Sequence, residues 1–113
     1  MREIRTPSGK PFRFKKCDGG EIIVYASDKK RKHQEKDAIV ITPYTVKQVC
    51  DAIKNKGRIR MGASRDLPPE SSLGAILRKD KQSPQQLSYL TAILESEGFC
   101  RIEKEGKAFV IVL

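Results

Sequence analysis

Residues 83–98 constrain the fold most, because this stretch carries both the start and the stop signals of a helix. Ser83 can accept hydrogen bonds from the first free N–H groups, and Pro84 stands where a missing N–H costs nothing. Gln86 completes an S-x-x-Q capping box, and Gly98 supplies a left-handed exit. We therefore predict a complete helix over 83–98.

The predicted helix has one apolar side and one polar, uncharged side. Leu87, Leu90 and Leu94 fall on the apolar side at helical spacing, with Ile93 at its edge. The opposite side carries Gln85, Ser88, Tyr89, Ala92 and Ser96. A face without long charged side chains fits the reading of base edges or docking on a protein. The alternative is a face that only contacts solvent.

The length of 113 residues, 38% of them hydrophobic, predicts a single domain with one core. No apolar run is long enough to span a bilayer, and the first residues do not resemble a signal segment. Cys17, Cys50 and Cys100 are scattered without a C-x-x-C pair, which favours reduced thiols over disulfides or zinc ligands. We expect a cytoplasmic protein without a membrane partner.

The formal net charge of +9 indicates an anionic partner, because a surface field of this sign attracts phosphate backbones. Residues 1–36 hold eleven basic and five acidic side chains, a net charge of +6. Residues 37–113 hold twelve and nine, a net charge of +3. The first third is therefore the electropositive part, unless the excess serves solubility alone.

The N-terminal part, residues 1–43, has the pattern of β structure. Residues 11–16 alternate apolar and basic side chains, residues 17–20 have turn chemistry, and residues 21–26 are β-branched and aromatic. This predicts a hairpin that exposes Arg13 and Lys15 on one face, with Arg5 as a further candidate. Residues 38–41 predict one more short strand.

Residues 29–36 form a run of basic and polar side chains without an apolar residue. Three interpretations are open: a solvated loop, a targeting signal, or a flexible arm on nucleic-acid phosphates. In the last case the contacts come from Lys29, Lys30, Arg31 and Lys32. His33, the only histidine, lies among lysines and receives no metal or catalytic role.

The remaining chain, residues 44–113, predicts three helices and a hairpin. Thr45 caps a helix that ends at Gly57, residues 58–61 form a brief strand, and a second helix opens at 68–70. Residues 79–82 separate it from the helix over 83–98. Strands over 99–104 and 107–113 follow. The second is apolar on both faces, so we expect it to be covered by protein on both sides or to pair at the centre of a sheet.

This order of elements over 45–113 resembles the winged-helix family, a helix-turn-helix with a β-hairpin wing. The resemblance implies that the 83–98 helix enters the DNA major groove, with Gln85, Ser88 and Tyr89 on base edges and Ala92 permitting close approach. It also implies phosphate contacts by basic residues before the helix and at the wing tip. These residues are Arg78, Lys79, Lys81, Lys104 and Lys107.

Several residues depart from the family's pattern. The presumed recognition helix has no Lys or Arg, Glu95 and Glu97 lie at its far end, and Glu103 and Glu105 reduce the charge of the wing. These departures favour the alternative that the winged helix docks on a protein or forms a dimer. Residues 38–41 and the C-terminal strand are candidates for pairing between chains.

Catalysis is not expected. The chain has no G-x-G-x-x-G, P-loop or H-E-x-x-H motif, and no Ser or Cys near a usable histidine in the sequence. Residues 105–107 match only the E-x-K part of a nuclease motif. We expect no cofactor, metal or small-molecule substrate.

The sequence therefore predicts an α+β single domain over residues 1–113: a three-helix winged helix-turn-helix with a C-terminal β-hairpin, preceded by a small basic N-terminal β-hairpin. The expected function is non-catalytic binding of nucleic acid, with duplex DNA favoured, in regulation or DNA processing. A protein-interaction or dimerisation module is the alternative, and an RNA- or ribosome-associated protein is a further one.

Overall fold

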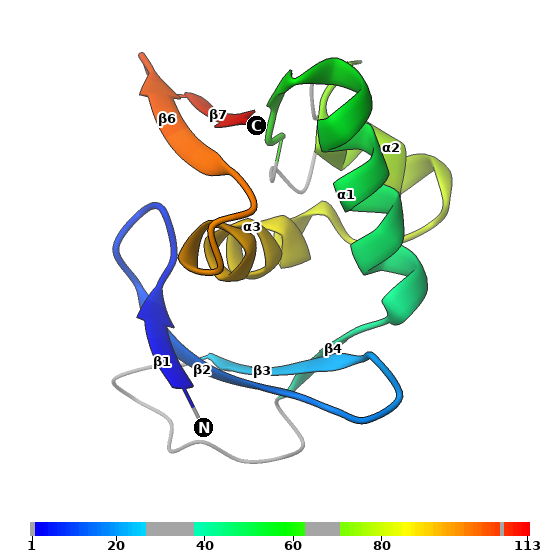
Figure 1. Cartoon of the computed structure of the whole chain (residues 1–113), viewed down its shortest axis with the longest axis vertical. Coiled ribbons are helices and arrows are strands. Elements are labelled where there is room, and N and C mark those ends of the chain that lie inside the picture. Colours follow the sequence, from blue (N-terminus) through cyan, green and yellow to red (C-terminus); the bar gives the residue numbers. More distant parts are fainter. Residues whose placement is uncertain (1, 27–37, 63–70, 107) are drawn as a thin grey trace.

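A computed structural model describes residues 2–26, 38–62, 71–106 and 108–113. Within these ranges the chain forms two antiparallel sheets on different sides of a central helix, α3 (Leu87–Ser96), as Figure 1 shows. A longer helix, α1 (Pro43–Lys56), and a short helix, α2 (Leu73–Lys79), complete the fold. None of the helices in this part of the chain is both long and apolar enough to cross a membrane.

The N-terminal sheet has four strands in the order β1-β2-β3-β4. The strands are β1 (Arg2–Arg5), β2 (Pro11–Lys16), β3 (Ile22–Ala26) and β4 (Ile39–Ile41). The alternation in β2 sends Phe12 and Phe14 into the core and leaves Arg13 and Lys15 exposed. This confirms the two predicted strands of the hairpin and their exposed basic residues.

The C-terminal sheet has three strands in the order β5-β7-β6. They are β5 (Arg58–Arg60), β6 (Arg101–Glu105) and β7 (Ala108–Val112). The prediction that the last strand lies at the centre of a sheet is confirmed, because β7 pairs with β5 on one side and β6 on the other. Apolar residues on both faces fit this central position.

Caps define the ends of α1. Thr42, not Thr45 as predicted, is the N-cap: its side chain accepts a hydrogen bond from the Thr45 N–H. Thr45 is instead fully buried. The predicted end at Gly57 is confirmed, since Gly57 has a φ of 70° and donates its N–H to the Ile53 carbonyl.

The helix predicted over 83–98 consists of a 3-10 turn, η2 (Pro84–Gln86), followed by α3. Ser83 accepts a hydrogen bond from the Gln85 N–H, so it acts as the predicted cap. The predicted capping box is absent, because the Gln86 amide donates to the Ser83 carbonyl at 3.0 Å. The other predicted helix starts later than expected: α2 has its N-cap at Ser72, and residues 68–70 lie outside the described part.

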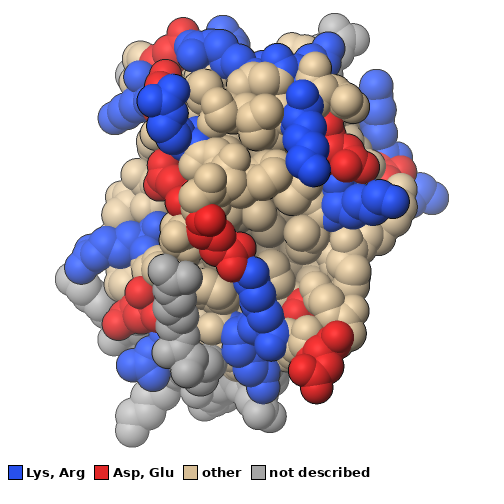
Figure 2. Space-filling model, viewed as in Figure 1, with Lys and Arg blue, Asp and Glu red and all other residues tan. Residues whose placement is uncertain are grey.

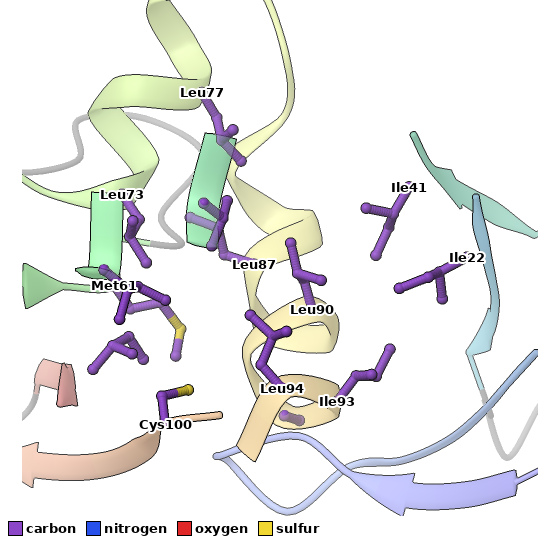
Figure 3. Packing of buried hydrophobic residues seen from close by; sticks show 14 of the residues in the cluster. Ile22, Ile41, Met61, Leu73, Leu77, Leu87, Leu90, Ile93, Leu94 and Cys100 are labelled. Carbon is purple, nitrogen blue, oxygen red and sulfur yellow. The ribbon is translucent and has the colours of Figure 1, made fainter. Parts of the chain in front are cut away.

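α3 forms the centre of the core, and Figure 3 shows its side chains pointing in two directions. Leu90 and Ile93 point toward Ile22 and Ile41 of the N-terminal sheet, and both are fully buried. On the other side, toward α2 and the C-terminal sheet, lie Leu87, Leu94, Met61, Leu73, Leu77 and Cys100. The two sheets therefore share one helix as their common core element.

The predicted fold class is wrong in its arrangement. The chain is a small α+β protein with three helices and seven strands in two antiparallel sheets, as far as the described residues go, and not a winged helix preceded by a small hairpin. β1 and β4 extend the N-terminal hairpin into a sheet that packs on α3. The two sheets cover α3 on both sides, so α3 does not protrude from the surface as a recognition helix does.

Candidate nucleic-acid interface

The face of the N-terminal sheet that points away from α3 is the first candidate surface, and we call it the outer sheet face. Strand register defines it, because residues directly paired across antiparallel strands share a face. One row pairs Glu3 with Arg13 and Tyr25, and the next pairs Lys15 with Ile23 and Val40. Arg5 pairs with Pro11, two residues before Arg13, and therefore lies on the same face.

The outer sheet face carries more positive than negative charge. Arg5, Arg13 and Lys15 are exposed, and Glu3 is the one acidic residue that the described strands add to this face. Neither Arg13 nor Lys15 forms an ion pair with another described residue. Arg5 donates to the Gly9 carbonyl at 3.1 Å, and no carboxylate of the described residues forms an ion pair with it.

Apolar side chains lie beside these cations. Val40 on the edge strand β4 is 55% exposed, Ile23 is half-buried, and Tyr25 is buried. The outer sheet face therefore combines free cations with apolar surface.

Two arginines of the C-terminal sheet are, in contrast, paired with carboxylates. Arg58 forms ion pairs with Glu103 and Glu105, and Arg101 also pairs with Glu103. Lys16, at the end of β2, pairs with Glu97 beyond α3. Figure 2 shows the same mixture on the face it presents, where red carboxylates stand among the blue cations.

The predicted phosphate contacts before α3 lie on the surface. Arg78, Lys79 and Lys81 are exposed at the end of α2 and in the turn that follows. Asp80 stands between them and accepts hydrogen bonds from the Tyr44 hydroxyl at 2.8 Å and the Gln48 amide at 2.9 Å. The hydrogen bond and the negative charge of Asp80 raise the pKa of the exposed Tyr44.

The predicted base-reading residues do not form one exposed face. Gln85 is exposed and Ser88 is half-buried. The half-buried ring of Tyr89 packs edge-on against Phe12, with 5.1 Å between centroids. Ala92 is only 5% exposed, so it offers little surface for the expected close approach of a base pair.

Other predicted residues fall in two groups. Lys104 is exposed on β6, directly paired with Phe109 of β7. The candidates Lys29, Lys30, Arg31, Lys32 and Lys107 lie outside the residues described.

Two surface hollows were not predicted. One, of about 270 Å³, lies between the turn that follows β1 and the C-terminal sheet, and we call it the inter-sheet hollow. It is lined by Arg5, Thr6, Pro7, Ala92, Glu95, Ile102, Lys104 and Phe109. The other, of about 390 Å³, is lined by Lys56, Arg58, Ile59, Arg60, Ser71, Glu105 and Val110. Sequence reasoning missed the inter-sheet hollow because two of its cations, Arg5 and Lys104, come from opposite ends of the chain, and no local pattern links them.

The cysteines offer no metal site in the described part of the chain. All three thiols are free. Burial, with a smaller effect of the Glu95 charge, raises the pKa of Cys100 to about 11, and burial also raises the pKa of Cys50. Both thiols therefore behave as core side chains and not as reactive thiolates.

Comparisons with known proteins assign no family. No protein-family model, curated protein or solved structure matches the chain.

Proposed function

We propose that this chain is a non-catalytic nucleic-acid-binding protein whose affinity comes from phosphate contacts on the outer sheet face. The observation that carries the proposal is the pair Arg13 and Lys15, exposed and without ion-pair partners among the described residues. Elsewhere in the fold, Arg58, Arg101 and Lys16 are paired with carboxylates. Free cations of this kind are available for phosphates.

The spacing of the pair supports the proposal. Alternate residues of a strand lie about 7 Å apart on one face. Two long cationic side chains at this separation can contact neighbouring phosphates of one strand. Arg5 continues the row diagonally across β1, and the formal net charge of +9 supplies long-range attraction toward a polyanion.

Because α3 is enclosed by the rest of the fold, the structure gives no reason to prefer duplex DNA over single strands. The preference for duplex DNA followed from a helix in the major groove, and α3 is covered on both sides. Phosphate contacts by a sheet do not by themselves require a duplex. Binding is therefore measured for duplex DNA, single-stranded DNA and single-stranded RNA in parallel.

The test is the double variant Arg13→Gln/Lys15→Gln, with fluorescence anisotropy of a labelled oligonucleotide as the readout. Two lost phosphate contacts weaken single-strand binding by about 20-fold at about 0.1 M salt, from a slope of about 0.7 per phosphate over one decade of salt below 1 M. Lys47→Gln/Lys56→Gln is the matched control, because it removes the same charge from exposed positions on α1. Equal losses in both variants would leave only an effect of net charge and would refute the assignment to the sheet.

The exposed Val40 on β4 favours a second candidate function, docking of another polypeptide. Among the described strands, β4 pairs with β3 alone and lies at the edge of its sheet, and edge strands are templates for added strands. If none of the three nucleic acids binds near physiological salt, this candidate stands ahead of nucleic-acid binding.

A further inference from the structure

The inter-sheet hollow combines cationic, apolar and carboxylate side chains from four parts of the chain. Arg5 and Lys104 supply two cations, from β1 and β6. Ala92 of α3, Ile102 of β6 and Phe109 of β7 supply apolar surface. Figure 1 shows why they meet: the turn after β1 lies beside β6, and both lie against α3.

We propose that this hollow holds one unstacked base of a single-stranded nucleic acid, while Arg5 and Lys104 contact the phosphates on either side of it. The proposal rests on the proposed function and names its substrate class. It is argued from the size, apolar lining and charge of the hollow.

The size of the hollow suits a small group. The volume of about 270 Å³ falls just below the roughly 300 Å³ at which pockets for drug-sized molecules begin. A single base fits this scale, and the hollow opens to solvent, so the rest of the strand can stay outside it.

The apolar lining suits an aromatic ligand. Phe109 is half-buried and lines the hollow, and aromatic side chains are the surfaces on which unstacked bases pack. Lys104 pairs directly with Phe109 across β6 and β7, so the two residues share a face. A phosphate bound by Lys104 would therefore lie next to a base that packs on Phe109.

The polar groups have separate tasks. Glu95 accepts the Ile102 N–H through Oε2 at 2.7 Å, which holds the carboxylate in place. Its Oε1 has no partner among the described residues and can accept an N–H group of a base. Thr6 is engaged in its own turn, where its hydroxyl accepts the Lys10 N–H at 3.0 Å. With two cations and one carboxylate, the hollow keeps a net charge of +1.

Single strands are favoured over duplexes because a stacked, paired base cannot enter the hollow without first leaving the helix. Arg5 stands on the edge strand β1, so its side chain extends from the outer sheet face, beside Arg13, and its position borders the hollow. A strand can thus run from Lys15 past Arg13 and Arg5 to the hollow.

Affinity measurements on two variants give the first test. Phe109→Leu removes the aromatic surface and should weaken single-strand binding by about tenfold. Lys104→Gln, at an exposed position that tolerates substitution, should weaken single strands more than Lys47→Gln does, and should change duplex affinity no more than Lys47→Gln. Equal effects of Lys104→Gln and Lys47→Gln on single strands would overturn the proposal even if Phe109→Leu fails to fold.

Methyl NMR of the full chain gives the second test, with oligothymidylate, oligouridylate and a DNA duplex as probes. The Ala92 and Ile102 methyl groups report on the hollow, and the Ile23 methyl groups report on the outer sheet face. We expect single strands to shift all of these signals, and the duplex to shift only those of Ile23. The two oligonucleotides distinguish DNA from RNA as the source of the base.

The outcomes separate the two proposals. If single strands bind and shift Ile23 but leave Ala92 and Ile102 unchanged, the hollow is not a base site, and the proposed function stands. If no nucleic acid binds, the proposed function fails, and the base site fails with it.

Discussion

Replacing Leu90 by alanine tests whether α3 is the shared core of the two sheets. Leu90 is fully buried, and it points from α3 toward the N-terminal sheet. Leucine-to-alanine changes at such sites cost about 2–5 kcal/mol, the larger values where the surroundings cannot collapse into the cavity. Leu90 is enclosed between α3 and the N-terminal sheet, and other residues hold both of these elements in place, so the cavity cannot collapse fully. We therefore expect a loss of about 3–4 kcal/mol in the free energy of unfolding.

Urea unfolding followed by far-ultraviolet circular dichroism and tyrosine fluorescence measures this loss. The chain has no tryptophan, and Tyr25 in the N-terminal sheet and Tyr89 in α3 provide two of its three tyrosine signals. A loss of this size is a large part of the 5–15 kcal/mol, roughly, that stabilises a domain. Both probes should report one transition at a lower urea concentration with an unchanged slope.

Two further variants make the result specific. Val40→Ala changes a side chain that is 55% exposed, and it should alter the free energy of unfolding by no more than about 0.5 kcal/mol. Leu87→Ala removes a buried side chain on the other side of α3 and should shift the same single transition. A loss below about 1 kcal/mol for Leu90→Ala would mean that the N-terminal sheet does not pack on α3, and separate transitions for the two leucine variants would mean that the sheets do not share a core.

Two other predictions concern stability. The raised pKa of Cys100, about 11 against an ordinary 9.0, means that the folded chain holds this proton more tightly than the unfolded chain. The resulting stabilisation is complete below pH 9 and is lost as the pH rises toward 11. The difference in urea midpoint between the wild type and Cys100→Ala should therefore narrow over this range. A difference that stays constant with pH would contradict this prediction. Gly57→Ala should cost about 1 kcal/mol, because φ is 70° and nothing lies within 4 Å of the added methyl group. Gly20→Ala should cost more in the same urea assay, since φ is 93° and Pro43 Cγ lies 3.2 Å from the new carbon; a smaller cost than Gly57→Ala would contradict this steric argument.

Local patterns predicted the elements that depend on neighbouring residues. The alternation over 11–16, the helix end at Gly57 and the central position of the last strand are all confirmed. Each of these follows from side-chain periodicity or from the backbone preference of one residue. Thr42 was missed as the cap of α1 because Thr45 offers the same chemistry three residues later.

Contacts between distant segments account for what sequence reasoning missed. The charged β1 carries only a short apolar signal, so its pairing with β2 was not predicted. Tyr89 and Ala92 fall on the helix face that the sequence predicts to be polar. In the structure Phe12 packs on Tyr89, and Ala92 lies in the core cluster. The hollow between Arg5 and Lys104 arises from the same long-range packing.

The dependence of affinity on salt tests the central claim most directly. The logarithm of the association constant for a single-stranded oligonucleotide is measured against the logarithm of salt concentration, for the wild type and Arg13→Gln/Lys15→Gln. If the outer sheet face holds phosphates, the wild-type affinity falls steeply with salt, and the double variant reduces the slope by about 1.4, or about 0.7 for each lost contact. A wild-type slope near zero, or identical slopes for the two proteins, would contradict the account.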